Sequence, residues 1–230
     1  DGAFAHDFRI HGKDEDEKRH FNERFALLTP LVKAWCTELV NEVTSIGIQV
    51  HGGMGFIEET GAAQHYRDAR ISSIYEGTNG IQANDLVGRK VLRDQGAALG
   101  SYLEEILETA ARIESDERLK PIAVKLKEAV SNLQSASHYV IEKAPSSQKF
   151  VGAVAYNFLM MMGYVAGAWY MARSAEKAVK ELDGLDKAFY ERKLASVNFY
   201  FAQLLPRHKG YQEAVIAGAE IGVSLNEACF

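Results

Sequence analysis

The sequence is short of cysteine and proline, and both shortages narrow the possible folds. Its 230 residues contain two cysteines, Cys36 and Cys229, which are far apart and lack the spacing of a metal site. We therefore expect no disulfide framework, and the cysteine content suits a reducing compartment. Four prolines and a single Asn-Gly pair, Asn79-Gly80, give few hairpin signals. These shortages favour helices throughout.

The chain also lacks a strong charge of one sign. Its formal net charge is -5, which leaves no basic footprint and argues against nucleic acid as the main partner. Hydrophobic residues make up 47% and charged residues 25%, both ordinary for a soluble globular protein. No signal peptide is visible, and the first residue is not Met, so we expect a start within a longer protein.

Apolar residues recur at helical spacing along the chain, which predicts an all-α fold. Residues 21–50 form the first long run, and Pro30 inside it predicts a kink or a new helix start. This helix should end at a double glycine, and a short helix should span residues 62–74. Another helix begins near Asn79, which can cap it, with Gln82 as the capping-box partner.

The sequence after Gln95 predicts an additional antiparallel helix bundle. Four or five helical stretches are separated by short breaks, as in up-down bundles. The expected helices cover about residues 99–113, 122–140, 149–182 and 187–205, and a last one ends near residue 225. Pro206 and Gly210 should interrupt the chain before that last helix. We therefore expect two domains, residues 1–95 and 96–230.

One stretch of the bundle is long enough to be weighed as a membrane span. Residues 150–172 carry no charge, and this length could cross a bilayer. Asn157 and several tyrosines and glycines are spread through the stretch instead of gathering at its ends. We therefore expect a buried central helix and no membrane span, with Met160, Met161 and Met162 in its core.

Two short motifs were weighed as ligand sites. Glu17-x-x-His20 has the spacing of half a di-iron carboxylate site, but no second copy occurs, so we expect no metal. The run from Gly52 to Gly55 lacks the third glycine of a dinucleotide fingerprint and follows no strand. It predicts either a helix end with a tight loop or a backbone that a diphosphate can approach.

The stretch from Ile74 to Gln82 places one carboxylate, Glu76, in an otherwise uncharged run. The position precedes a helix N-terminus, and Gly77 leaves the backbone open to a ligand. A carboxylate fixed in an apolar surround can serve as a general base. The alternative is a solvated glutamate at a helix entry, which is common.

Three motifs in order carry a family resemblance. The stretches 49–56, 66–71 and 75–78 resemble, in order and spacing, the C-terminal signature of acyl-CoA dehydrogenases, a similarity that covers roughly residues 30 to 93. Residues 96–230 resemble the extra C-terminal helical domain of a larger, mainly bacterial subgroup that includes 3-methylthiopropanoyl-CoA dehydrogenase-like proteins. The stretches 188–195 and 204–206 fit that pattern.

The resemblance implies a reaction for Glu76. As the catalytic base it would take the pro-R α-proton of an acyl-CoA thioester, while the β-hydrogen leaves as hydride to N5 of FAD. The product would be a trans-2-enoyl-CoA, and Gly77 would lie against the substrate. A straight fatty acyl-CoA and a thioether analogue such as 3-methylthiopropanoyl-CoA both suit the subgroup.

The resemblance also implies FAD as cofactor and a set of residues that hold it. The stretch Gln49, Val50, His51, Gly52 and Gly53 would contact the adenosine diphosphate part across a subunit interface, and Thr78, Asn79 and Gly80 would lie near the flavin. Many relatives have other residues where this chain has Asn79-Gly80. A homodimer or homotetramer in the bacterial cytoplasm, with an electron-transfer flavoprotein as acceptor, is implied in the same way.

Relatives also have an N-terminal helical domain and a middle β-domain, which hold the flavin ring and close the acyl pocket. We find neither in this sequence, so the chain alone should bind FAD weakly, if at all. The alternative from another class is a non-catalytic helical module for assembly or regulation that retains the signature.

Overall fold

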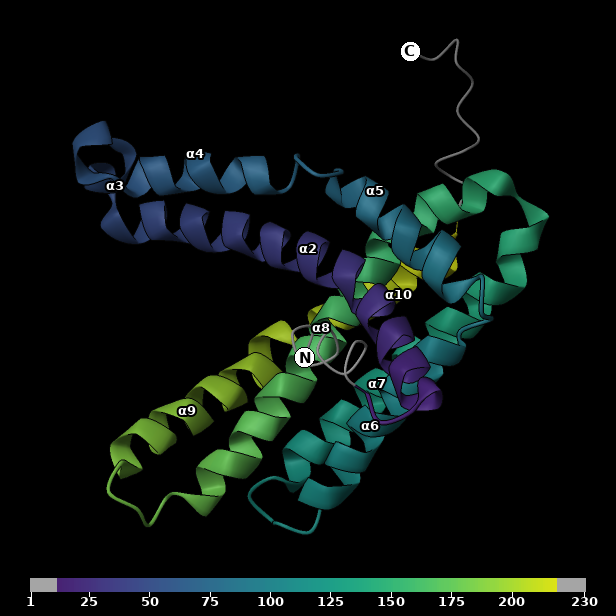
Figure 1. Ribbon diagram of the computed structural model, residues 1–230. Coiled ribbons are helices and arrows are strands. Elements are labelled where there is room, and N and C mark those ends of the chain that lie inside the picture. Colours follow the sequence, from purple (N-terminus) through teal and green to yellow (C-terminus); the bar gives the residue numbers. More distant parts are fainter. Residues whose placement is uncertain (1–11, 219–230) are drawn as a thin grey trace. The chain divides into compact units, whose positions relative to one another are not determined.

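The computed structural model describes residues 12–218 and divides into two compact units, residues 1–89 and 90–230 (Figure 1). Within the described residues every regular element is a helix, so the predicted all-α class is confirmed. The boundary in the chain falls between Arg89 and Lys90, whereas the predicted boundary follows residue 95.

The first unit is built on one long helix, α2 (Glu15–His51). Its N-cap is Asp14, whose side chain accepts a hydrogen bond from the Glu17 amide, and three acids in the first turn suit the helix dipole. The predicted end is confirmed, because the cap is Gly52 with a φ of 60°. A new helix start at Pro30 was wrong, since Pro30 lies inside α2, which loses one backbone bond there and continues.

Short elements bring the chain back along α2. They are α3 (Gly53–Phe56), the 3₁₀ turn η1 (Glu58–Thr60), α4 (Ala62–Ser72) and α5 (Asn79–Asn84), followed by the π-helical turn η2 (Asp85–Val91). Both α4 and α5 pack against α2. The connection between α4 and α5 is therefore held beside the middle of α2.

The second unit is a helix bundle, as predicted. Its elements are α6 (Ala97–Ile113), α7 (Lys120–Lys143), η3 (Ala144–Ser146), α8 (Gln148–Lys180), α9 (Lys187–Phe199), the π-helical turn η4 (Tyr200–Leu204) and α10 (Arg207–Ala217). A break at Gly210 was wrong, because this glycine lies inside α10. The predicted continuation of the last helix to about residue 225 falls outside the described residues.

Helix α8 is the central helix of the bundle and packs against α6, α7, α9 and α10. By length and composition it could cross a membrane, and 67% of its most apolar window is buried inside the structure. Met160, Met161 and Met162 are all buried, as expected of core residues. This burial agrees with the prediction of a central bundle helix.

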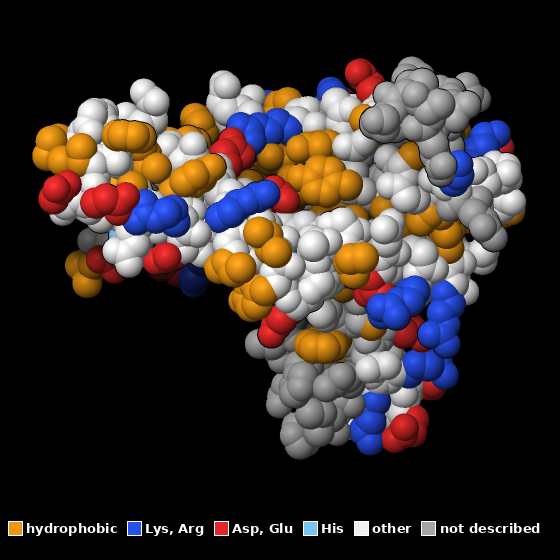
Figure 2. Space-filling model, turned by 90° about the horizontal axis from the view of Figure 1, so that it is seen from above, with side chains coloured by type: hydrophobic (Ala, Val, Ile, Leu, Met, Phe, Trp, Pro, Cys, Tyr) orange, Lys and Arg blue, Asp and Glu red, His pale blue; other side chains and the backbone are white. Residues whose placement is uncertain are grey.

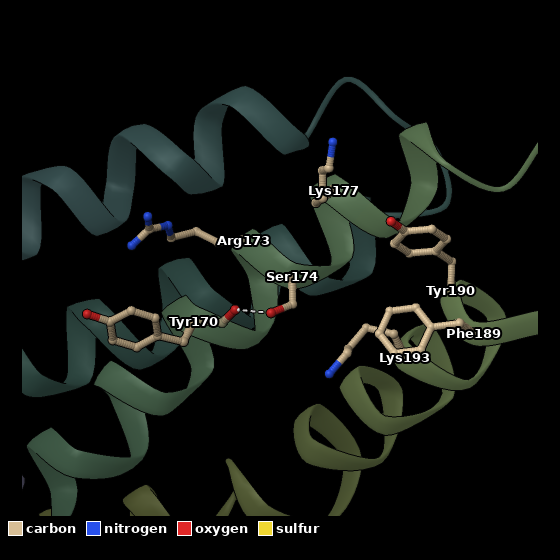
Figure 3. Close-up of a pocket in the computed structure, with 7 residues that line it drawn as sticks. All are labelled: Tyr170, Arg173, Ser174, Lys177, Phe189, Tyr190 and Lys193. Atoms are coloured by element: carbon tan, nitrogen blue, oxygen red, sulfur yellow. Dashed lines mark hydrogen bonds between the residues drawn. The ribbon is translucent and has the colours of Figure 1, made fainter. Parts of the chain in front are cut away.

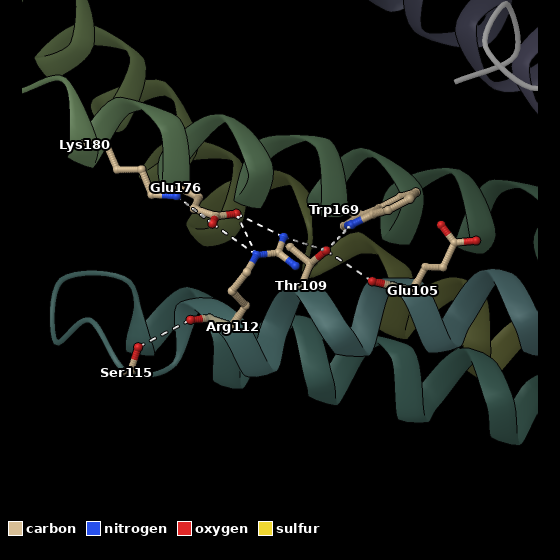
Figure 4. A network of polar contacts seen from close by, with 7 residues as sticks. All are labelled: Glu105, Thr109, Arg112, Ser115, Trp169, Glu176 and Lys180. Carbon is tan, nitrogen blue, oxygen red and sulfur yellow. Dashed lines mark hydrogen bonds and ion pairs between the residues drawn. The ribbon is translucent and has the colours of Figure 1, made fainter.

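Polar contacts join α8 to α6 (Figure 4). The Trp169 indole donates a hydrogen bond of 2.8 Å to the hydroxyl of Thr109, which satisfies an otherwise buried N–H. One turn further along α6, the Arg112 guanidinium pairs with Glu176 of α8 at 3.1 Å. This hydrogen bonding lowers the pKa of the Glu176 carboxyl. Two such contacts along one helix pair favour a single register between α6 and α8.

Candidate active site

The turn between α4 and α5 carries the candidate base. Glu76 has a φ of 54° and Gly77 a φ of 86°, so two successive residues adopt the left-handed conformation. Glycine adopts it freely, but a residue with a Cβ does so at a cost. The backbone N–H of Asn79 donates a hydrogen bond to the Ser73 carbonyl, 3.2 Å away, and this bond closes the turn. Glu76 is thus held in a conformation that its own side chain disfavours.

The cap of α5 differs from the prediction by one residue. Thr78 is the N-cap, and its hydroxyl accepts a hydrogen bond of 3.3 Å from the Ile81 amide. Asn79 is already the first residue of α5, so its assignment as the cap was wrong. Gln82 does not act as a capping-box partner either, because its side-chain amide donates to the Glu76 carbonyl at 3.1 Å.

The buried side chain of Asn79 connects this turn to α2. Its amide nitrogen donates to the Glu38 carboxylate at 2.7 Å, and its amide oxygen accepts from the Lys33 ammonium at 2.9 Å. Lys33 also donates to the Gly77 carbonyl at 2.7 Å. Sequence reasoning missed Lys33 and Glu38. Lys33 and Glu38 are two of many charged residues on α2, so no signal in the sequence singled them out.

The surroundings of the Glu76 carboxylate correct one expectation. Glu76 and Gly77 are exposed, so the described residues do not form the apolar surround that the sequence analysis anticipated. The nearby apolar side chains Ile74, Tyr75 and Ile81 are exposed as well. The turn therefore presents one carboxylate within an open apolar surface.

A second candidate turn lies where α2 ends. A Cβ at Gly52 or Gly53 would meet no atom within 4 Å, so the backbone there is open. Gln49, Val50 and His51 are exposed beside it. An open glycine backbone of this kind leaves room for an anionic group to approach its N–H groups.

Two neighbours of this second turn have structural roles. His51 interacts through Nδ1 with the Gly47 carbonyl at 2.8 Å, as expected of a residue at a helix end. Gly55 is buried, and a Cβ at this position would lie 2.3 Å from the Ile48 carbonyl oxygen. Glycine is thus required at residue 55 for α3 to fold back onto α2, a role that sequence reasoning missed.

The predicted site residues consequently fall into two groups. Gly77, Thr78, Asn79 and Gly80 adjoin Glu76, whereas residues 49–53 lie at the C-terminal end of α2. Lys33, which contacts the first group, precedes Gly52 by 19 residues, and this is about 28 Å along a helix. One copy of the first unit therefore does not bring the two groups together.

The first unit exposes many apolar side chains along α2, α3 and α4 (Figure 2 shows part of this surface at the left). The most exposed are Val50 at 78% and Phe56 at 80%, beside the glycine turn. The others are Val32, Val40, Val43, Ile46, Met54, Ile57, Tyr66 and Ile71. Exposed apolar surface of this extent is typical of a region that packs against further protein.

The second unit has a groove of about 420 Å³ between α8 and α9 (Figure 3). Its cations already have partners: Lys177 pairs with Glu181 at 2.6 Å, and Arg173 and Lys193 lie over the rings of Trp169 and Phe189. Among residues 12–218, no cluster of His, Cys, Asp or Glu could hold a metal ion.

Each of the two units contains a stretch that matches a known protein family. Residues 10–91 match the family described as "Acyl-CoA dehydrogenase, C-terminal domain". Residues 102–225 match the one described as "Acetyl-CoA dehydrogenase C-terminal like". The second match alone covers more than half of the 230 residues.

Curated relatives extend the comparison. The chain is 41% identical over 201 residues to a 3-methylmercaptopropionyl-CoA dehydrogenase of Ruegeria pomeroyi, which covers 86% of this chain and 34% of the relative. It is 31% identical over 231 residues to a broad-specificity linear acyl-CoA dehydrogenase of Mycobacterium tuberculosis. This alignment covers 96% of this chain and 37% of that relative. The chain thus spans about a third of the length of these relatives. It belongs to the acyl-CoA dehydrogenase family and carries the C-terminal domains of that family.

Proposed function

We propose that this chain is part of an FAD-dependent acyl-CoA dehydrogenase that converts an acyl-CoA thioester to a trans-2-enoyl-CoA. The observation that carries the proposal is Glu76, an exposed carboxylate on a turn fixed from α2, within a chain of this family. A solvated helix-entry glutamate would need no left-handed backbone. Such strain persists where the surrounding structure and the function require it.

Glu76 is the base in this proposal. Its carboxylate takes the α-proton of the thioester, and the backbone of Gly77 leaves space for the substrate beside it. The acidity of the α-carbon depends on hydrogen bonds to the thioester carbonyl, and exclusion of water strengthens them. The exposed apolar residues around Glu76 would supply part of this dry surround once covered by substrate and further protein.

When bound, FAD would supply the acceptor for the β-hydrogen, which leaves the substrate as hydride. Residues 49–53 would hold its diphosphate through their open backbone, and residues 78–80 would lie near its ring. Because these groups are about 28 Å apart along α2, a flavin at Glu76 would meet residues 49–53 of a second copy. The separation thus supports a homodimer or homotetramer with shared sites.

The substrate class follows from the relatives. They are named for 3-methylmercaptopropionyl-CoA, butyryl-CoA and linear acyl-CoA substrates, so we propose a short or medium unbranched acyl-CoA, with or without a thioether. An electron-transfer flavoprotein as acceptor and a cytoplasmic location complete the proposal and rest on the resemblance alone.

Replacement of Glu76 by Gln in the full-length enzyme tests this function. We expect the variant to keep its flavin and to bleach the flavin band about 10²- to 10⁴-fold more slowly on mixing with butyryl-CoA or 3-methylthiopropanoyl-CoA, because the base is lost. Glu59→Gln, at another exposed position of the same unit, is the matched control. Bleaching of E76Q at the wild-type rate would reject Glu76 as the base, and a full-length protein without flavin would favour the non-catalytic module.

A further inference from the structure

The backbone of the Glu76–Gly77 turn is held through both of its carbonyls. The Gly77 carbonyl accepts from the Lys33 ammonium at 2.7 Å, and the Glu76 carbonyl accepts from the Gln82 side chain at 3.1 Å. The first contact comes from α2 and spans 44 residues of sequence, whereas the second is local. Lys33 thus ties the backbone of this turn directly to the long helix.

Lys33 is itself held by a chain of hydrogen bonds. Its ammonium donates to Asn79 Oδ1 at 2.9 Å, and Asn79 Nδ2 donates to Glu38 Oε1 at 2.7 Å. These partners fix the orientation of the Asn79 amide, because an ammonium only donates and a carboxylate only accepts. Thr37 adds a hydroxyl 3.0 Å from Asn79 Oδ1. A cation and an anion of one helix are therefore bridged by the first residue of α5.

We propose that Lys33 is a positioning residue for the reaction: with Asn79 and Glu38 it holds the left-handed Glu76–Gly77 backbone so that the Glu76 carboxylate is aimed at the α-carbon of the substrate. This inference rests on the proposed function of Glu76. Two left-handed residues in succession must be held by their surroundings. Lys33 supplies a charged donor to that segment from the helix beside it.

Lys33 does not need to touch substrate for this role. It acts through the Gly77 carbonyl, and a displacement of about 1 Å at a reacting group is enough to slow a reaction about 100-fold. The role also explains why Asn79 is buried and directed toward α2. An alanine at residue 79 could not bridge Lys33 and Glu38, because its side chain has neither a donor nor an acceptor.

The test compares Lys33→Met, Lys33→Arg and the control Lys18→Met in the full-length enzyme. Lys18 lies on the same helix and pairs with Glu15. We expect K33M to lower the rate of flavin reduction at saturating butyryl-CoA about 10- to 100-fold, with flavin content and KM within about twofold of wild type. K33R keeps charged donors and should recover part of the rate, and K18M should match wild type.

Hydrogen–deuterium exchange gives a readout that does not depend on turnover. Peptides that cover residues 73–80 should exchange faster in K33M than in wild type or K18M, while peptides of the bundle remain unchanged. A K33M enzyme with the wild-type rate and wild-type exchange would overturn the proposal. So would K33M and K33R proteins that both lose flavin and melt earlier, since this would indicate a purely structural role.

The same experiment separates the two proposals. If wild type bleaches with substrate and K33M bleaches equally fast, the role of Lys33 is rejected and the function of Glu76 stands. If the flavin of wild type is not reduced by any acyl-CoA, the proposed function fails, and the role of Lys33 is rejected with it.

Discussion

Two residues of this chain share an unusual backbone geometry. Each is followed by a glycine that is also left-handed. The φ values are 54° for Glu76 and 86° for Gly77, and 56° for Gln95 and 81° for Gly96. A left-handed residue with a Cβ costs roughly 1–2 kcal/mol. Gln95 comes shortly after the π-helical turn η2, and a left-handed residue commonly ends a helix at such a position. Glu76 has no helix to end at that point, so its strain is better explained by function.

Glycine at these two positions tests the strain. We expect Glu76→Gly to raise the free energy of unfolding of this chain by about 0.5–1 kcal/mol, because relief of strain exceeds the extra backbone entropy lost on folding. Gln95→Gly should gain less, since it also loses a side-chain hydrogen bond to the Leu92 carbonyl. Urea unfolding measures both variants. A lower midpoint in both would contradict the strain argument, and E76G should be inactive whatever its stability.

At this scale the sequence singles out candidate residues but not their contacts. A lone carboxylate and consecutive glycines stand out in the chain, and the roles of Glu76 and the double glycine stay predictions. The cap was misplaced by one residue, since Thr78 and Asn79 both suit an N-cap and only the packing of Asn79 against α2 distinguishes them. Lys33 was missed because its partners lie 44 and 46 residues away.

At the scale of elements, α10 is joined to α7 through a buried histidine. His208 Nδ1 lies 2.6 Å from the Leu205 carbonyl, and Nε2 lies 3.1 Å from the Asn132 amide nitrogen. The carbonyl requires a proton on Nδ1, which leaves Nε2 to accept from Asn132, so the ring is neutral. Burial lowers the pKa of His208, against an opposing contribution from its hydrogen bond to the Leu205 carbonyl.

This lowered pKa predicts a pH dependence of stability. The unfolded chain binds a proton near pH 6.5 while folded His208 stays neutral, so stability is present above that pH and falls as the pH decreases through the unfolded pKa. We expect wild type to lose more stability than His208→Gln between pH 7.5 and pH 5.5, as measured by urea unfolding. Gln can still donate and accept but does not titrate. Equal losses in the two proteins would contradict this assignment.

Element boundaries were predicted where local signals agree with packing. The end of α2 at a glycine and the start of α7 near Pro121 follow directly from backbone chemistry. The new helix start considered at Pro30 and the break expected at Gly210 are absent, because tertiary packing maintains both helices against the cost of these residues. The uncharged stretch in α8 was predicted as core from the polar residues along its length, and the burial of 67% of its most apolar window agrees with that prediction.

At the scale of the molecule, the two candidate turns offer little enclosure to a cofactor. Residues 49–53 are exposed, as are Glu76, Gly77, Thr78 and Gly80. Apolar side chains on α2, α3 and α4 are exposed as well. A ligand that is to be held tightly needs most of its surface buried. The first unit by itself would cover a flavin only in part.

We therefore expect the 230-residue chain alone to lose added FAD on gel filtration, whereas the full-length enzyme should retain it. The ratio of flavin absorbance to protein absorbance after the column measures this directly. Retention of one flavin per isolated chain would contradict the expectation and would show that these domains suffice for cofactor binding. The need for detergent to keep the chain in solution would instead favour a membrane role for α8.

Helix α2 contacts the turn of the candidate base through Lys33 in its middle and ends in the glycine turn at Gly52. An α-helix advances 1.5 Å and rotates about 100° for each residue. Loss or gain of one residue between these points would swing the glycine turn to another face of the helix, whereas a loop would absorb the same change. The 18 residues between Lys33 and Gly52 should thus tolerate changes of side chain much more readily than changes of length.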